Sequence, residues 1–180
     1  MTSPRPFISV IVPTYNRPGP LRDALDALAA LDYAPHEVIV VDDGSDEPLD
    51  ELVAPFQEHA PIRLLRQDNA GPAAARNAGA ELATGTLLAF TDDDCRPAPG
   101  WLNALAEAHR RQPEALLSGD TLNALPHNVF STASQLLIDY LYEYFAPQSG
   151  HIPLVASNNL ALPAEGFRAL GGFDEAFPLA

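Results

Sequence analysis

The sequence predicts an α/β fold in which a mostly parallel sheet is flanked by helices. Along residues 1–120, short runs rich in Val and Ile alternate with longer segments whose apolar residues recur at helical spacing. The apolar runs are typical of strands that are buried on both faces of a parallel sheet. Polar clusters follow several of these runs, where an open parallel sheet has its ligand crevice.

The expected strands and helices alternate along this part of the chain. We expect strands at residues 7–12, 37–41, 62–65, 86–91 and 115–118. We expect helices between them, at residues 18–29, 49–56, 72–83 and 101–111. Pro18 suits the first turn of the first helix, because the N–H that proline lacks has no intrahelical partner there.

The alternation stops after Asp120, and the remaining residues are expected to form a further region of the same domain. We therefore divide the chain into residues 1–120 and residues 121–180, with a helix at 129–145 and an extended stretch at 152–162. One side of that helix carries Leu136, Leu137, Tyr140, Leu141 and Tyr144. Ordinary packing, a homodimer contact, cover for a cleft and contact with a membrane remain open for this side.

The composition excludes some classes of partner. With 24 acidic and 10 basic residues the formal net charge is -14, which would repel a nucleic-acid backbone. Cys95 is the single cysteine, so no intrachain disulfide can form and we expect a cytoplasmic protein. No segment approaches the roughly 20 apolar residues of a transmembrane helix, so any contact with the inner face of a membrane would be peripheral.

Three consecutive carboxylates follow the fourth expected strand. If the chain stays extended through them, Asp92 and Asp94 point the same way, because alternate residues of a strand share a face. Clustered carboxylates repel one another, and a bound cation relieves that repulsion. Hard oxygen ligands suit Mg²⁺ or Mn²⁺, which commonly bind substrate phosphates as well. The alternative is a solvated acidic turn.

The first strand is followed by Pro13, Thr14, Tyr15, Asn16 and Arg17. Tyr15 could stack on a nucleotide base, with the polar groups of Thr14 and Asn16 fixing its orientation. A plain loop would also explain these residues.

Two further polar segments lie at the predicted crevice. Asp42 and Asp43 follow the second strand, where a carboxylate could bind a ribose or base edge or could instead be a helix N-cap, with Gly44 giving the turn. Asn69 and Gly71 precede a helix whose N-terminus would favour anions. Arg76, about one turn into that helix, could reach a phosphate or remain a solvated surface residue.

Taken together, these segments resemble glycosyltransferase family 2. The resemblance covers nearly the whole chain and is carried by residues 9–17 (SVIVPTYNR), 40–45 (VVDDGS), 68–71 (DNAG), 75–79 (ARNAG), 90–94 (FTDDD), 157–159 (SNN) and 171–175 (GGFDE). It implies a GT-A fold with a Rossmann-like sheet. It also implies a hexosyltransferase that moves a sugar from a nucleotide diphosphate to an acceptor hydroxyl with inversion, as in cell-envelope polysaccharide synthesis.

The same resemblance assigns roles to residues. Residues 1–120 would bind the nucleotide sugar, most simply a UDP-sugar, and residues 121–180 would form part of the site for a saccharide or lipid-linked acceptor. Asp94 and Asp92 would hold Mn²⁺ or Mg²⁺. The nucleotide sugar would contact Pro13, Thr14, Tyr15, Asn16, Arg17, Asp42, Asp43, Asn69, Gly71, Arg76, Asp92 and Asp93. The acceptor side would include Asn158, Asn159, Gly172 and Asp174.

The sequence departs from the family pattern at its end. Family members place a Glu-Asp pair that contains the general base shortly after the GGFDE segment, and here the sequence ends at Ala180 without one. We therefore expect the base to lie beyond Ala180 and assign no catalytic base to Asp174 or Glu175. A non-catalytic module that binds nucleotide sugars is the alternative reading.

Overall fold

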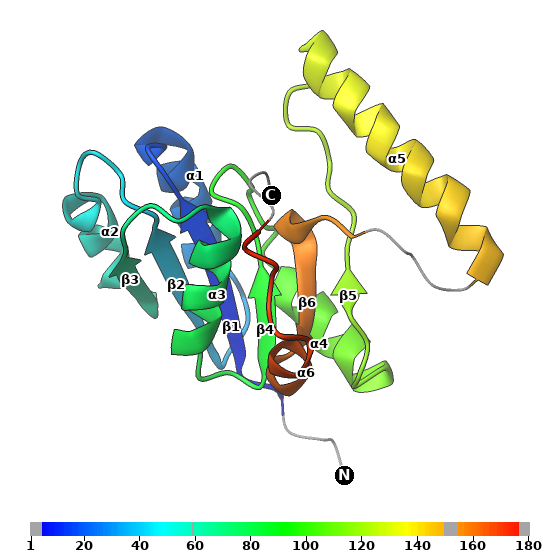
Figure 1. Cartoon of the computed structure of the whole chain (residues 1–180), viewed down its shortest axis with the longest axis horizontal. Coiled ribbons are helices and arrows are strands. Elements are labelled where there is room, and N and C mark those ends of the chain that lie inside the picture. Colours follow the sequence, from blue (N-terminus) through cyan, green and yellow to red (C-terminus); the bar gives the residue numbers. More distant parts are fainter. Residues whose placement is uncertain (1–4, 59, 150–154, 177–180) are drawn as a thin grey trace.

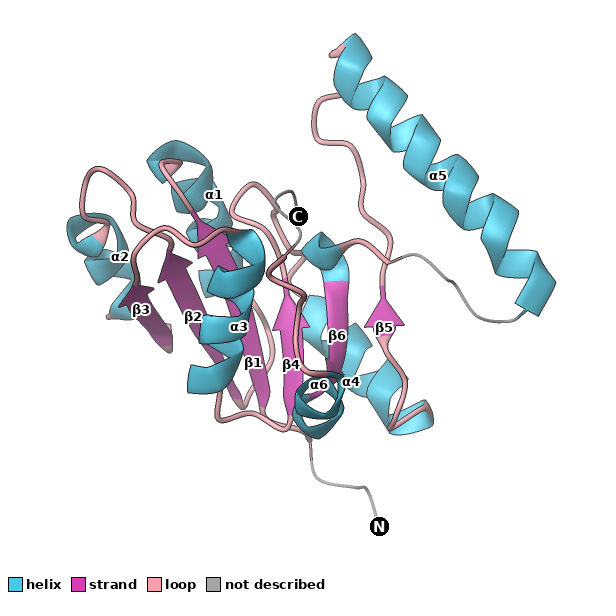
Figure 2. Cartoon of the chain, in the orientation of Figure 1, coloured by secondary structure: helices cyan, strands magenta, loops and turns pink. Residues whose placement is uncertain are grey.

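The computed structural model describes residues 5–58, 60–149 and 155–176. Within them, a six-stranded sheet has helices packed on both of its faces (Figures 1 and 2). The order of the strands is β3-β2-β1-β4-β6-β5. The predicted α/β class is confirmed.

The sheet is parallel except at one strand. Its members are β1 (Ile8–Thr14), β2 (His36–Asp42), β3 (Ile62–Arg66), β4 (Leu87–Phe90), β5 (Leu117–Ser118) and β6 (Leu160–Pro163). β1 to β4 run parallel to one another, whereas β6 is antiparallel to both β4 and β5. The last strand of the described residues, β6, therefore lies between two strands that come much earlier in the sequence.

The predicted extended stretch at 152–162 is only partly correct. Residues 152–154 lie outside the described residues, and Ser157–Asn159 form a short 3₁₀ turn, η1. Extended pairing begins at Leu160.

Two hydrophobic clusters lie on the two faces of the sheet, since alternate strand residues point to opposite sides. On one face, Ile8, Val10 and Val12 pack with the apolar residues of α1 (Pro18–Ala29), α2 (Asp50–Gln57) and α4 (Trp101–Arg111). On the other, Ile11 packs with α3 (Pro72–Leu82) and α6 (Ala164–Leu170). The predicted helices 18–29, 49–56, 72–83 and 101–111 agree with α1 to α4 to within a residue at each end.

A glycine lets α3 lie close to the sheet. A Cβ atom added at Gly79 would lie 2.6 Å from Cγ2 of Ile11 and 3.0 Å from Cγ2 of Val41. Distances below about 3 Å do not occur between such carbons, so only glycine fits here without a shift of its neighbours. This close packing aligns α3 along β1 and β2.

A buried carboxylate near the start of β2 joins several elements of the fold. Glu37 is 6% exposed, and its oxygens accept hydrogen bonds from the Ser9 hydroxyl, the backbone and hydroxyl of Thr84, and the guanidinium of Arg63. Burial alone would raise the pKa of Glu37, but these donors outweigh it and hold the pKa below its usual value.

The long helix α5 (Val129–Ser149) stands away from the sheet (Figure 1). Its described links to the rest of the chain include hydrogen bonds from Gln135 to the carbonyl of Thr121 and from the backbone of Ala156 to the Tyr142 hydroxyl. Several of its apolar side chains are exposed, including Leu136, Leu137 and Tyr140. None of the described helices combines the length and apolar composition that a membrane crossing requires.

Candidate functional site

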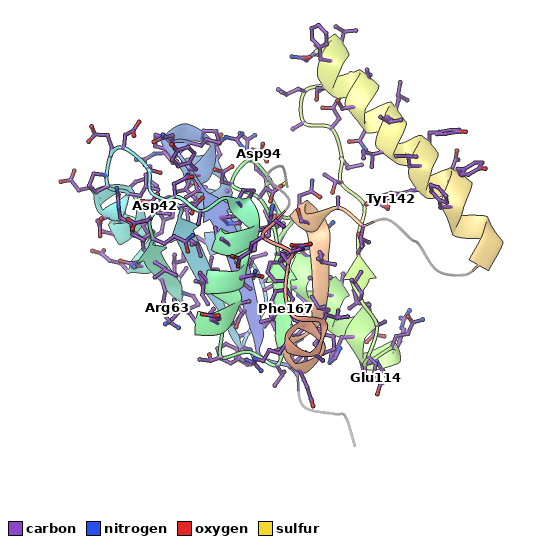
Figure 3. The ribbon with its side chains drawn as sticks, viewed as in Figure 1. Asp42, Arg63, Asp94, Glu114, Tyr142 and Phe167 are labelled. Atoms are coloured by element: carbon purple, nitrogen blue, oxygen red, sulfur yellow. The ribbon has the colours of Figure 1, made fainter. Side chains whose placement is uncertain are left out.

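The loop after β1 meets the loop after β4 at one edge of the sheet. The Thr14 hydroxyl donates a 2.7 Å hydrogen bond to Oδ2 of Asp93. Arg17 bridges two carboxylates, with Nη1 2.9 Å from Oδ1 of Asp93 and Nη2 2.8 Å from Oδ2 of Asp94. Asp94 lies at the end of the sheet where the parallel strands β1 and β4 finish (Figure 3). The predicted meeting of two strand ends is therefore present.

Burial and charge act in opposite directions at this edge. Burial raises the pKa of Asp93, while the Thr14 hydroxyl and the Arg17 charge counteract part of that rise. The pKa of Arg17 is raised, chiefly by its hydrogen bond to Asp94. The neighbours of Asp93 are more exposed: the Asp92 side chain is partly exposed and that of Asp94 is half exposed.

A second arginine approaches the same loop from α3. Nη2 of Arg76 lies 2.7 Å from Oδ1 of Asp92, and the arginine side chain is only 3% exposed. Among the described residues, neither Nε nor Nη1 of Arg76 has a hydrogen-bond acceptor. The ring of Phe173 covers the guanidinium, with its centroid 5.6 Å from Cζ. Arg76 is thus buried, so the prediction's alternative of a solvated surface arginine is wrong.

Asp92 and Asp94 do not share one face, which corrects the prediction that the chain stays extended through them. β4 ends at Phe90, and the backbone N–H of Cys95 bonds the carbonyl of Asp92, closing a turn. The carboxylates consequently diverge: Asp92 faces Arg76, and Asp94 faces Arg17. β6 has no residue that pairs with β4 beyond Phe90, whereas β1 continues to Thr14 and still accepts the N–H of Thr91 through the carbonyl of Ile11.

The donor set suits a hard divalent cation only in part. Among the described residues, no group of three or more His, Cys, Asp or Glu side chains is arranged to hold a metal ion. Asp92 and Asp94 nevertheless expose carboxylate oxygen at 32% and 50% side-chain accessibility. Mg²⁺ and Mn²⁺ commonly take one or two carboxylates and complete their shell with water and phosphate. Each of these two residues can supply one carboxylate to such a shell.

Asp42 is engaged within the protein. It is fully buried, Oδ1 accepts the backbone N–H of Ser45, and Oδ2 lies 3.0 Å from Nη1 of Arg66. The first contact closes the turn that follows β2. The predicted alternative of a helix cap is wrong, because α2 begins at Asp50 after Leu49, without a side-chain cap. Sequence reasoning missed Arg66, because nothing in its spacing marks it as the partner of Asp42.

Asp43 fastens the loop that precedes α3. Its Oδ1 accepts the backbone N–H of Ala70 at 3.0 Å, and its Oδ2 accepts that of Gly71 at 2.8 Å. The Asn69 amide donates to the carbonyl of Asp43, and Gly71 has a φ of 93°, which favours glycine. This clasp brings the N-terminus of α3 to the carboxyl end of β2.

The remaining residues of the first loop differ in exposure. Pro13 is buried in β1 beyond the last residue that pairs with β4, so no ladder hydrogen bond to β4 is lost at this point. Tyr15 is 47% exposed at the edge. Asn16 has a φ of 54°; its backbone N–H bonds the Ser45 hydroxyl, and its side chain accepts the N–H of Asp46.

The predicted acceptor-side residues fall into two separate places. The Asn159 amide accepts from the Trp101 indole N–H and donates to the carbonyl of Asp120, whereas the amide oxygen of Asn158 is buried without a partner among the described residues. Gly172 lies against Asn77 on α3, and Asp174 accepts the backbone N–H of Ala176.

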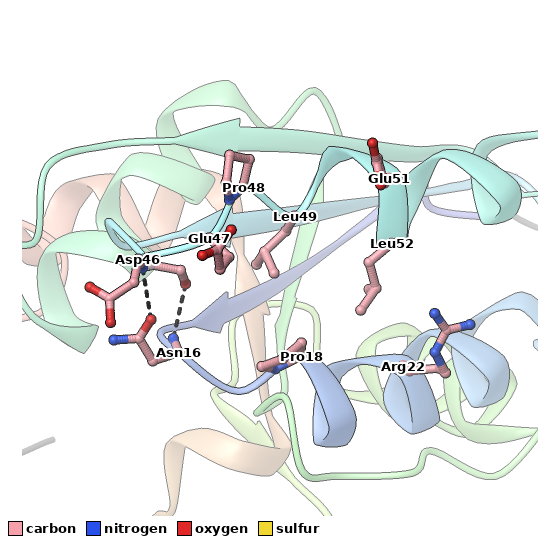
Figure 4. Close-up of a pocket in the computed structure, with 10 residues that line it drawn as sticks. Asn16, Pro18, Arg22, Asp46, Glu47, Pro48, Leu49, Glu51 and Leu52 are labelled. Atoms are coloured by element: carbon pink, nitrogen blue, oxygen red, sulfur yellow. Dashed lines mark hydrogen bonds between the residues drawn. The ribbon is translucent and has the colours of Figure 1, made fainter.

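A hollow of about 590 Å³ lies on the α1 and α2 side of this edge (Figure 4). Its walls include Asn16, Arg22, Asp46, Glu47 and Glu51. The hollow is not lined by Thr14, Arg76, Asp92, Asp93 or Asp94. We therefore place the candidate site at the contacts of Arg17 and Arg76 and not in this hollow.

Comparison with known proteins identifies the family. The family model for glycosyl transferase family 2 matches residues 9–167. The validoxylamine A glucosyltransferase of Streptomyces hygroscopicus subsp. limoneus is 30% identical over 98% of this chain. The glycosyltransferase AglE of Haloferax volcanii is 39% identical over 57% of the chain. The chain spans 46% of the Streptomyces relative and 35% of AglE, so it covers half or less of these proteins.

Solved structures share the fold. The mannosyltransferase PcManGT from Pyrobaculum calidifontis, in complex with GDP-Man and Mn²⁺, has a TM-score of 0.78 and 26% identity, with 96% of this chain and 49% of that one covered. S. aureus TarS 1-349 in complex with UDP has a TM-score of 0.73 and 20% identity, with 96% and 52% covered. The sheet and its flanking helices are therefore the GT-A arrangement, and the chain belongs to glycosyl transferase family 2.

Proposed function

We propose that this chain binds a nucleoside-diphosphate sugar at the edge formed by the ends of β1, β2 and β4 and by α3. In the proposed reaction the sugar passes to an acceptor hydroxyl with inversion, and Mn²⁺ or Mg²⁺ assists. The observation that carries the proposal is the pairing of Arg17 and Arg76 with three carboxylates at this edge, in a protein of formal net charge -14. Family membership supplies the reaction class.

Two arginines supply the positive charge that a diphosphate requires. The guanidinium of Arg76 has two buried nitrogens without an acceptor among the described residues. A buried donor without a partner costs about 1–3 kcal/mol, and an anionic ligand would relieve that cost. Both nitrogens are shielded from solvent in this structure. The covering side chains must therefore shift before a ligand oxygen can reach them.

The other residues of the edge would orient the nucleoside and the cation. Tyr15 offers an exposed ring for a base, and the turn around Asp42 and Asp43 fixes the wall beside it. Asp92 and Asp94 would hold the divalent cation. When bound, such a cation neutralises charge that builds on the leaving diphosphate. The ligands named for the two solved structures, UDP and GDP-Man, support a nucleotide-sugar donor.

Calorimetry with a charge-matched pair of variants tests the proposal. UDP and GDP would each be titrated into the protein, with MnCl₂ or with chelator. We expect binding with Mn²⁺ that Asp94→Asn weakens about 10- to 100-fold, the range of a lost charged interaction. Glu114→Gln removes the same charge from an exposed residue away from this edge (Figure 3) and should bind like the parent. Equal affinity in chelator, or equal losses in both variants, would contradict the metal assignment.

Product release separates an enzyme from a binding module. UDP or GDP released from UDP-sugars or GDP-sugars would be measured with a panel of saccharide and lipid-linked acceptors. Acceptor-dependent release supports transfer. Tight donor binding with release no faster than in buffer would favour the non-catalytic module.

A further inference from the structure

An asparagine on α3 holds a segment that is almost a hundred positions away in sequence. Nδ2 of Asn77 donates to the carbonyl of Phe173 at 2.9 Å and to Oε1 of Glu175 at 2.8 Å. Its Oδ1 accepts the backbone N–H of Phe173 at 2.8 Å. Because the side-chain amide pairs with both backbone groups of one residue, it imitates a strand partner and fixes that residue's position.

The backbone beside this contact leaves no room for a side chain. Gly172 has a φ of 78°, and a Cβ atom added there would lie 2.7 Å from Oδ1 of Asn77. Two requirements thus select glycine at position 172: the left-handed backbone and the close approach of the Asn77 amide. We call Asn77 together with residues 172–175 the latch. The backbone of Gly172 allows the Asn77 amide to approach this closely, so the latch does not depend on an exposed contact alone.

The latch determines where the Phe173 ring lies. That ring packs edge-on against Phe90 at 5.1 Å and against Phe167 at 5.6 Å between centroids. Its centroid is 5.6 Å from Cζ of Arg76, the residue next to Asn77. Cζ of Arg76 lies over the ring, and Nη2 of the same guanidinium still reaches Asp92 at 2.7 Å. Phe173 thus restrains Arg76 without using its donors.

We propose that Asn77 and Phe173 are positioning residues: the Asn77 amide seats residues 172–175, and the Phe173 ring then holds the Arg76 guanidinium toward Asp92. Neither residue is required to touch the nucleotide. The inference rests on the proposed role of Arg76 in donor binding. It adds that the acceptor-side segment sets the affinity for the donor, because the two regions share this contact.

The test measures nucleotide affinity in variants that distinguish the aromatic ring of Phe173 from the apolar volume that it fills. UDP and GDP would be titrated with MnCl₂ into the full chain and into Asn77→Ala, Phe173→Leu, Phe173→Tyr, Arg76→Gln and the double variant Phe173→Leu with Arg76→Gln. We expect Asn77→Ala and Phe173→Leu to weaken binding about 2- to 30-fold, the range of a cation–π contact. Phe173→Tyr retains the ring and should bind like the parent. In the Arg76→Gln background, Phe173→Leu should cause no further loss.

Asn103→Ala is the matched control. Asn103 also bridges a helix to a distant loop through its amide, in this case to the carboxylate of Asp32, and it lies outside the candidate site. The affinity of Asn103→Ala for UDP and GDP should equal that of the parent. Thermal unfolding of every variant identifies those that fail to fold. If Phe173→Leu is among them, Asn77→Ala, which should weaken binding, carries the comparison with the parent and with Phe173→Tyr.

The outcomes separate this inference from the proposed function. If Arg76→Gln weakens binding but Asn77→Ala and Phe173→Leu bind like the parent, the positioning role is wrong and the proposed function stands. If the parent binds neither nucleotide, the proposed function fails, and thermal unfolding alone tests the latch. Phe173→Leu should lower the Tm less in the Arg76→Gln background than in the parent. Equal falls in Tm in the two backgrounds would show that the ring and the guanidinium do not stabilise each other.

Discussion

The Thr14 hydroxyl joins the end of β1 to the loop after β4, through its 2.7 Å hydrogen bond to the buried carboxylate of Asp93 across 79 positions of sequence. Asp93 is 3% exposed and also contacts Arg17, so its charge is stabilised from two sides. The bond fixes the loop from which Asp92 and Asp94 project. The geometry of the proposed donor site thus depends on a residue that need not contact the cation.

Thr14→Val should destabilise the protein by about 1.5–3 kcal/mol, because it leaves a buried carboxylate with one donor fewer. Valine has nearly the shape of threonine, so packing changes little. Thr14→Ser retains the hydroxyl and is the control. Urea unfolding at neutral pH measures the difference, and identical midpoints for the parent and Thr14→Val would show that the bond contributes nothing.

Asp42→Ala should lower the free energy of unfolding by about 1.5–3 kcal/mol, since the Ser45 N–H and the Arg66 guanidinium lose a buried partner. Asp46→Ala removes a carboxylate from an exposed position of the same loop and should be nearly neutral. Chemical denaturation gives both values. Nucleotide titration of the folded variant shows whether Asp42 also serves the ligand. Unchanged stability in Asp42→Ala would contradict the structural role.

Glu37→Gln should remove one part of the protein's acid sensitivity. The folded pKa of Glu37 lies below its ordinary value of 4.5, so the unfolded chain binds its proton first as the pH falls. The stabilisation that the Glu37 carboxylate provides is complete above pH 4.5, and it is lost as the pH falls through the folded pKa. The variant should be less stable than the parent at pH 7 by about 1.5–3 kcal/mol, and this gap should close on acidification. A gap that is independent of pH would refute the assignment.

Two glycine-to-alanine substitutions in helices should have opposite signs. Gly79→Ala places a methyl group 2.6 Å from Ile11 and should destabilise by about 1–3 kcal/mol through overpacking. At Gly166 in α6 the nearest atom to an added Cβ is 3.9 Å away, so Gly166→Ala should stabilise by about 0.5–1 kcal/mol through helix propensity. Thermal unfolding of the two variants, measured side by side, decides between these effects, and a stabilised Gly79→Ala would sink the close-packing argument.

The sequence was sufficient for the fold class because its signals are local. The Val- and Ile-rich runs and the helical spacing of Leu21, Leu25 and Leu28 depend only on neighbouring residues, and the strands and helices through Ser118 lie close to where these patterns place them. Thr14 and Asp93 were recognisable as site candidates for a similar reason. Parallel strands end at one edge, so the residues that follow them meet there.

The tertiary structure decided the contacts that join distant segments. No local pattern marks β6 as the strand between β4 and β5, or shows that the loop after Phe90 turns so that Asp92 and Asp94 diverge. The pairings of Arg66 with Asp42 and of Asn77 with Phe173 likewise have no periodicity to reveal them. Side-chain hydrogen bonds between distant positions depend on distance and direction in the folded chain, and sequence spacing carries neither.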